Sequence, residues 1–138
     1  MLFDSQFNDG LFENNVNDIL LENANNGFLK GNMFTNEYIG YKSFKYNNLD
    51  AIDEKNKLLL KIYECEFAII DLSLYLDLHP NNTNLYSIYR NYVKKFNDLK
   101  EDFESKYTPL DKCFEKYEEY KWIDNPWPWD SNGGIKYV

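Results

Sequence analysis

The sequence predicts a small all-α protein built on an antiparallel hairpin of two helices. Two long stretches carry apolar residues every three or four positions, and a short link that contains a proline separates them. A length of 138 residues favours one folded domain. We therefore expect a helical hairpin domain with an aromatic tail over residues 51–138, preceded by a flexible arm over residues 1–50.

The first predicted helix covers residues 52–78. Its apolar residues follow a 4-3-4-3-4 spacing, which is typical of one buried helix face, and they are Leu58, Ile62, Cys65, Ile69, Leu72 and Leu76. Asp53 and Glu54 lie in its first turn, where acidic side chains suit the helix dipole. The helix is expected to end before Pro80, because proline disfavours helical geometry in the residue that precedes it.

The second predicted helix covers residues 84–107, with Asn82 or Thr83 as its N-cap. One apolar face spans roughly 100° of arc and comprises Leu85, Ile88, Tyr89, Tyr92, Phe96, Leu99, Phe103 and Tyr107. Asp102 and Lys106 form a favourable i,i+4 pair, and Thr108-Pro109 ends the helix. Residues 110–121 could form a third, short helix through Leu110, Phe114 and Tyr117.

The two ends of the chain lack sustained periodicity. In residues 1–50, Gly10, Gly27, Gly31 and Gly40 interrupt every candidate element, so this arm is expected to be extended or partly disordered, with room for a short helix over 16–24. Near the other end, Pro126 and Pro128 exclude a helix or a central strand. The three tryptophans of this tail are expected to dock on an apolar surface.

The first predicted helix carries a second apolar face, nearly opposite the first, which comprises Leu59, Leu60, Tyr63, Phe67, Ile70, Leu74 and Leu78. A helix that is apolar nearly all round must be buried nearly all round, whereas a hairpin covers only one face of each helix. The cover for the second face could come from the C-terminal tail, from the N-terminal arm or from another subunit. This feature indicates an interaction protein.

Composition and motifs give no support for an enzyme. The net charge of −8 argues against nucleic acid and anionic membrane surfaces as partners. His79 is the only histidine, and Cys65 and Cys113 stand in no metal-binding cluster, so we expect no metal, no cofactor and reduced cysteines. No nucleophile or phosphate-loop motif is present, and no signal peptide or membrane-spanning run is visible.

Residues 67–80, with the phrase Leu74-Tyr75-Leu76-Asp77-Leu78-His79-Pro80, resemble the signature of the CotJB family of spore coat proteins. The resemblance continues through Tyr107-Thr108-Pro109-Leu110, where the family has glycine in place of Thr108, to the terminal Pro126-Trp127-Pro128-Trp129. It covers residues 58–130. A second segment, over residues 27–41, is similar to short CotJA-type coat proteins, although Thr35 and Gly40 stand where proline is common.

The resemblance implies a structural protein that joins the spore coat from the mother-cell cytoplasm and assembles through protein contacts. It implies other coat proteins as partners, among them a manganese-catalase-like and a CotJA-like protein, and further copies of the chain could take part. The alternative is an adaptor that recruits or regulates the manganese-catalase-like protein. The residues that we expect to bind partners are Trp122, Pro126, Trp127, Pro128 and Trp129 in the tail, Phe67, Ile70 and Leu74 on the second face, and Phe34 and Tyr38 in the arm.

Overall fold

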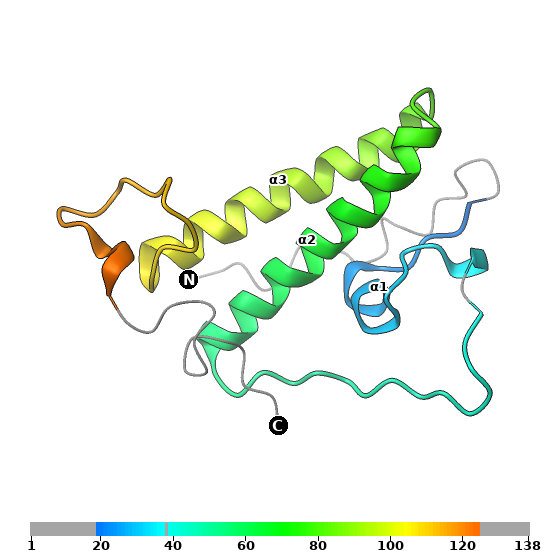
Figure 1. Cartoon of the computed structure of the whole chain (residues 1–138), viewed down its shortest axis with the longest axis horizontal. Coiled ribbons are helices and arrows are strands. Elements are labelled where there is room, and N and C mark those ends of the chain that lie inside the picture. The colour runs from blue at the N-terminus through cyan, green and yellow to red at the C-terminus, as the bar shows by residue number, and fades with distance from the viewer. Residues whose placement is uncertain (1–18, 38, 125–138) are drawn as a thin grey trace, which may run out of the picture.

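The structure, a computed structural model, describes residues 19–37 and 39–124 (Figure 1). The α-helices of this part of the chain are α1 (Ala24–Lys30), α2 (Glu54–Leu78) and α3 (Thr83–Lys106). Two short 3-10 helices, η2 (Thr35–Glu37) and η3 (Lys121–Ile123), complete the described elements, which include no strand. The predicted all-α class is confirmed.

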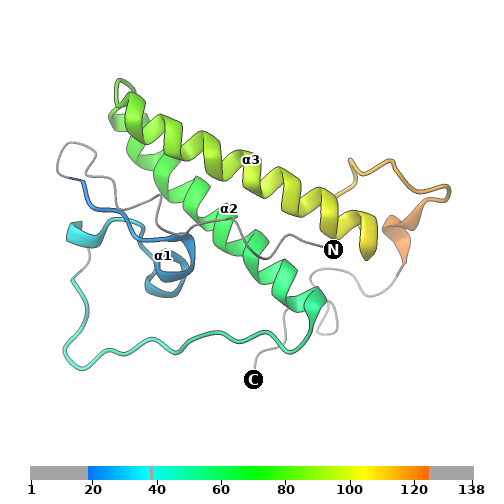
Figure 2. The ribbon, with the colours of Figure 1, turned by 180° about the vertical axis from the view of Figure 1, so that it is seen from behind.

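Helices α2 and α3 lie side by side and run in opposite directions, and the two views of Figures 1 and 2 agree on this arrangement. Each helix begins at a side-chain cap: Asp53 accepts a hydrogen bond from the Asn56 N–H at 2.8 Å, and Asn82 accepts one from the Leu85 N–H at 3.0 Å. Such caps satisfy backbone donors that the first turn leaves unpaired. The observed ends lie within two residues of the predicted ones.

The third, short helix that residues 110–121 could form is not present. Only η3 at its end is helical, and the rest of the segment is irregular. Its side chains and backbone bind the last turns of α3 instead: the Leu110 N–H donates to the buried Glu104 carboxylate at 2.8 Å, Lys100 pairs with Asp111, and the Tyr117 hydroxyl donates to the Glu104 carbonyl. These contacts compete with helix formation and attach the segment to the end of α3.

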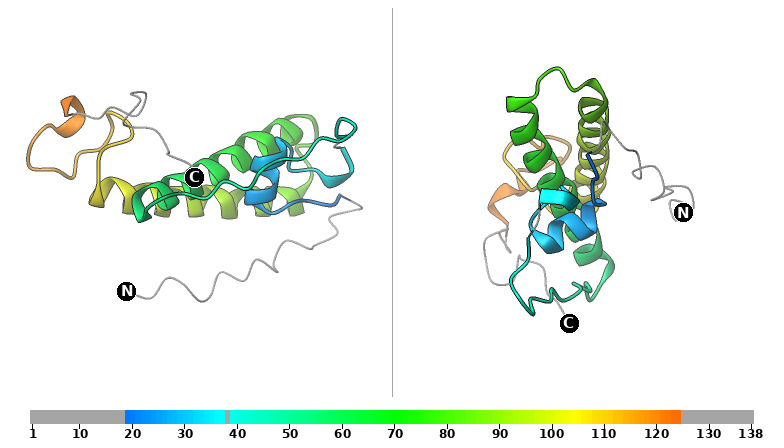
Figure 3. Two further views of the ribbon diagram at one scale, coloured as in Figure 1. Left: turned by 90° about the horizontal axis from the view of Figure 1, so that it is seen from below. Right: turned by 90° about the vertical axis from the view of Figure 1, so that its right-hand side faces the viewer.

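Part of the N-terminal arm is folded. Helix α1 packs against α2 (Figures 1 and 3), and Leu21 and Phe34, on either side of it, form a backbone bridge. Gly27 lies within α1, where a Cβ would be only 2.3 Å from the Met33 sulfur, so the position has room only for glycine. Gly31 ends the helix at a positive φ of 74°, a conformation that glycine adopts without strain. The helix predicted over 16–24 is not formed at residues 19–23, and residues 16–18 lie outside the described part.

The core crosses the predicted domain boundary at residue 50. Met33 and Phe34 of the arm lie in one apolar cluster with Cys65, Ala68 and Leu72 of α2 and with Leu85, Ile88 and Tyr92 of α3. A second cluster, formed by Leu59, Ile62 and Phe103, holds together the other end of the hairpin. Residues 19–37 are thus part of the same packed unit as the two long helices.

Candidate interaction surface

The first apolar face of α2 packs as the spacing predicts. Ile62, Cys65 and Leu72 are buried, and Leu58, Ile69 and Leu76 are partly buried at the edges of the two clusters. On α3, Leu85, Ile88, Tyr92 and Phe103 are buried in the same clusters. This face therefore holds the hairpin together and is not available to a partner.

The arm covers part of the second face of α2. On this face the Phe28 and Phe67 rings pack edge to face at a centroid distance of 6.0 Å, and beside it the Phe34 ring stacks on Tyr75 at 4.9 Å. The Met33 N–H donates a hydrogen bond to the Asp71 carboxylate at 2.7 Å, and the Asn25 amide donates one to Glu64 at 2.7 Å. Of the three covers that the sequence allows for this face, the structure shows the arm.

A row of three apolar side chains on α2 remains uncovered by described residues. Ile70 is 54% exposed, Leu74 is 60% exposed and Leu78 is 80% exposed. They recur every four residues, so they follow one another along one side of the helix. On a helical wheel the charged residues next to this row are acidic: Glu66 and Asp77 are exposed, and Asp71 is half-buried beneath the arm. We call Ile70, Leu74 and Leu78 the α2 row.

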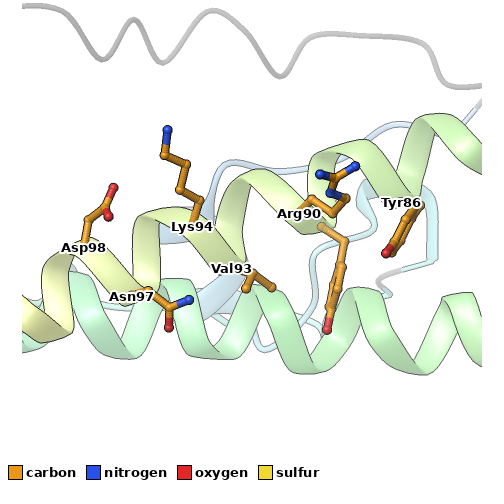
Figure 4. Close-up of a pocket in the computed structure, with 7 residues that line it drawn as sticks. Tyr86, Arg90, Val93, Lys94, Asn97 and Asp98 are labelled. Carbon is orange, nitrogen blue, oxygen red and sulfur yellow. The ribbon is translucent and has the colours of Figure 1, made fainter.

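Helix α3 carries a second exposed feature, an open groove of about 450 Å³ (Figure 4). Arg90 and Lys94 extend from the helix on the side away from α2, and Val93 and Asn97 point toward α2. The Tyr86 and Tyr89 rings stack with centroids 6.0 Å apart, and the Arg90 guanidinium lies 6.0 Å from the Tyr86 centroid. The lining residues are Tyr86, Tyr89, Arg90, Val93, Lys94, Asn97 and Asp98. We call this feature the α3 groove.

The structure places the predicted partner-binding residues in different environments. Phe34 is buried under its stacking contact with Tyr75 and belongs to the core of the chain itself, and Phe67 is partly buried under α1. Ile70 and Leu74 are exposed, and Trp122 is half-buried in η3. Tyr38, Pro126, Trp127, Pro128 and Trp129 lie outside the described residues. Among the described candidates, the structure therefore leaves the α2 row most accessible.

Sequence reasoning missed two exposed groups. One is the α3 groove. The sequence could have indicated it, because Tyr86 and Arg90 lie outside the apolar face of their helix and both are residue types that are enriched at interfaces. The other is the segment between η2 and α2, where Ile39, Tyr41, Phe44, Tyr46 and Ile52 are exposed. No periodicity marks this segment, so its apolar residues could not be assigned to a face beforehand.

No group of three or more His, Cys, Asp or Glu side chains that could hold a metal ion is found in residues 19–37 and 39–124. His79 is exposed at the end of α2 and stacks on Tyr75 with centroids 4.2 Å apart. Both cysteines are free thiols, and burial raises the pKa of Cys65 to about 11, which keeps it protonated.

Comparison with known proteins identifies a family over more than half of the chain. A protein-family model described as CotJB protein matches residues 56–130, which include α2 nearly whole, α3 and the segment bound to its end. No curated protein and no solved structure matches the chain. Within the described residues, no helix is both long enough and apolar enough to span a membrane.

Proposed function

Because the chain belongs to the CotJB family of spore coat proteins, we propose that it is a structural component which assembles into the coat through protein contacts of the α2 row. The observation that carries this proposal is the exposure of Ile70, Leu74 and Leu78 after both α3 and the arm have packed on α2. Burial of each such side chain by a partner would contribute on the order of 1.5–3 kcal/mol.

The spacing and the charges of the row indicate the kind of contact it can make. Apolar side chains at i, i+4 and i+8 fit the groove or the helix of another protein. Glu66 and Asp77 next to the row favour a partner with basic side chains around its own apolar surface.

The substitution Ile70→Asp tests the proposal. Since Ile70 is 54% exposed, the variant should keep its free energy of unfolding within about 0.5 kcal/mol of the wild type. It should nevertheless lose retention on the coat when spores that express the tagged variant are fractionated. The matched control is Ile39→Asp, which places the same charge on a residue that is 94% exposed and belongs to the connection between η2 and α2.

Retention of Ile70→Asp at the level of the control would contradict a role for the α2 row. Ile69→Asp provides the opposite comparison, because Ile69 packs on the core cluster and an unpaired carboxylate there should unfold the chain. Identifying the proteins that cross-link to the wild type also distinguishes a structural component from an adaptor. Many coat partners favour a structural component, whereas one stoichiometric partner, such as a manganese-catalase-like coat protein, favours the adaptor.

A further inference from the structure

We propose that the α3 groove binds the segment of residues 124–130 from a second copy of this chain, so that copies join tail to groove. The inference rests on the proposed function, because it names one contact through which a coat component would assemble. It concerns a different surface from the α2 row, and the two can therefore be tested separately.

The groove offers aromatic and cationic groups together. Tyr86 and Tyr89 stack at a 17° interplanar angle and present their rings beside Val93. Arg90 and Lys94 stand four residues apart on the outer side of the helix, and Asp98 closes one end of the groove. Such a site suits a ligand that combines flat apolar groups with acidic ends.

The segment of residues 124–130 has this chemistry. It reads Asp-Asn-Pro-Trp-Pro-Trp-Asp, with one acidic residue at each end, and no basic residue lies between Lys121 and Lys136. Alternating prolines favour an extended polyproline conformation, which binds aromatic-lined grooves at a low cost in conformational entropy. Asp124 already lies 3.7 Å from Lys121, but both side chains are largely exposed, so this ion pair is weak and exchangeable.

The length of the chain works against binding of the segment along the whole groove of the same copy. Element η3 lies beside the C-terminal end of α3, beyond Lys106 (Figure 1). Trp127 and Trp129 are three and five residues beyond Asp124 and can extend at most about 10 Å and 17 Å from it. Val93, at the middle of the groove, lies 13 residues before Lys106, which corresponds to roughly 20 Å along the helix. The two tryptophans therefore fall short of the middle of the groove in the same copy, whereas the groove of a second copy can take the whole segment.

Binding between two different surfaces has a consequence for assembly. A heterologous contact either closes into a ring or continues as an open chain of copies. Each copy presents one groove and one tail segment, so both geometries remain consistent with the inference. The α2 row takes no part in this contact and can bind other coat proteins.

Two sets of full-length variants test the pairing of charges by sedimentation. In the first, Arg90→Glu and Lys94→Glu reverse the charge of the groove; in the second, Asp124→Lys and Asp130→Lys reverse the charge of the tail segment. Each set alone should associate at least about tenfold more weakly than the wild type, because groove and tail then carry like charges. An equimolar mixture of the two sets should regain association, because each groove then meets a tail of opposite charge.

The variant with Lys42→Glu and Lys112→Glu has the same net charge as the groove variant, changes two exposed residues outside the groove, and should associate like the wild type. Replacing Trp127 and Trp129 by alanine should abolish association and leave the circular dichroism spectrum unchanged. A wild type that stays monomeric at millimolar concentration, or a mixture that does not recover, overturns the inference. If Ile70→Asp still loses retention on the coat in that case, the proposed function stands without it.

Discussion

Two buried residues, Glu104 and Gly27, have structural roles that cannot be inferred from their residue type alone. Glu104 is an acidic residue with only 4% of its surface exposed, yet its carboxylate accepts a hydrogen bond from the Leu110 N–H. Gly27 admits Met33 through the absence of a side chain, and Met33 is fully buried. Such roles depend on partners distant in sequence, and a pattern of residue types along one helix cannot reveal them.

The two cysteines should differ sharply in reactivity. Cys65 is 1% exposed and its pKa is raised to about 11 by burial, whereas Cys113 is exposed. Only the thiolate reacts with alkylating reagents. We expect iodoacetamide at pH 8 to label Cys113 quickly and Cys65 only after unfolding, as peptide mass spectrometry would show.

The same pKa predicts how stability depends on pH. In the unfolded chain the Cys65 thiol ionises near its ordinary value of 9.0, and in the folded chain it ionises near 11. Its contribution is thus fully present below pH 9 and is lost as the pH rises from 9 to 11, by up to roughly 1.4 kcal/mol per pH unit. A Cys65→Ser variant that showed the same loss in that window as the wild type would contradict this assignment.

Among the elements, the two long helices could be predicted from the sequence, and the arm could not. The α2 and α3 ends follow from local signals that act within a few residues, namely Asp53, Asn82 and Pro80. Helix α1 has only seven residues, one of them a glycine, and a helix of this length is not stable by itself. Its stability comes from packing on α2. The arm residues that pack, Met33 among them, show no regular apolar spacing in the sequence, so this packing could not be predicted. At residues 110–121 the apolar spacing allowed a helix, but the segment is irregular and forms hydrogen bonds with Glu104 instead.

Alanine substitutions in the arm should measure how much this packing contributes. Met33→Ala removes a fully buried side chain and should lower the free energy of unfolding by about 2–5 kcal/mol. Ile39→Ala, six residues later, removes an apolar side chain of similar size that is 94% exposed and should change it by less than about 0.5 kcal/mol. Urea denaturation of both variants provides the comparison, and equal effects would mean that the arm is not packed.

At the scale of the whole molecule, the partition of α2 among its neighbours determines the surface that is left. The sequence predicted correctly that α2 has more apolar surface than α3 can cover. It left open which segment covers the rest, because the tail, the arm and a partner are all compatible with the same pattern. The structure assigns Phe67 and Tyr75 to contacts with the arm and leaves Ile70, Leu74 and Leu78 exposed.

The exposed connection over residues 39–53 has a consequence for how α1 is held. Most of its side chains are exposed, so the connection holds few contacts of its own and acts as a tether. Helix α1 therefore binds α2 as a ligand would that is covalently linked to its binding site. The free energy of closing such a tether grows only with the logarithm of its length, by about 0.6 kcal/mol for each doubling. A Gly-Ser insert that doubles this connection should therefore leave α1 bound, and hydrogen exchange of the Met33 N–H should become faster by no more than about threefold. The high local concentration that the tether provides is what allows seven helical residues to remain bound to α2.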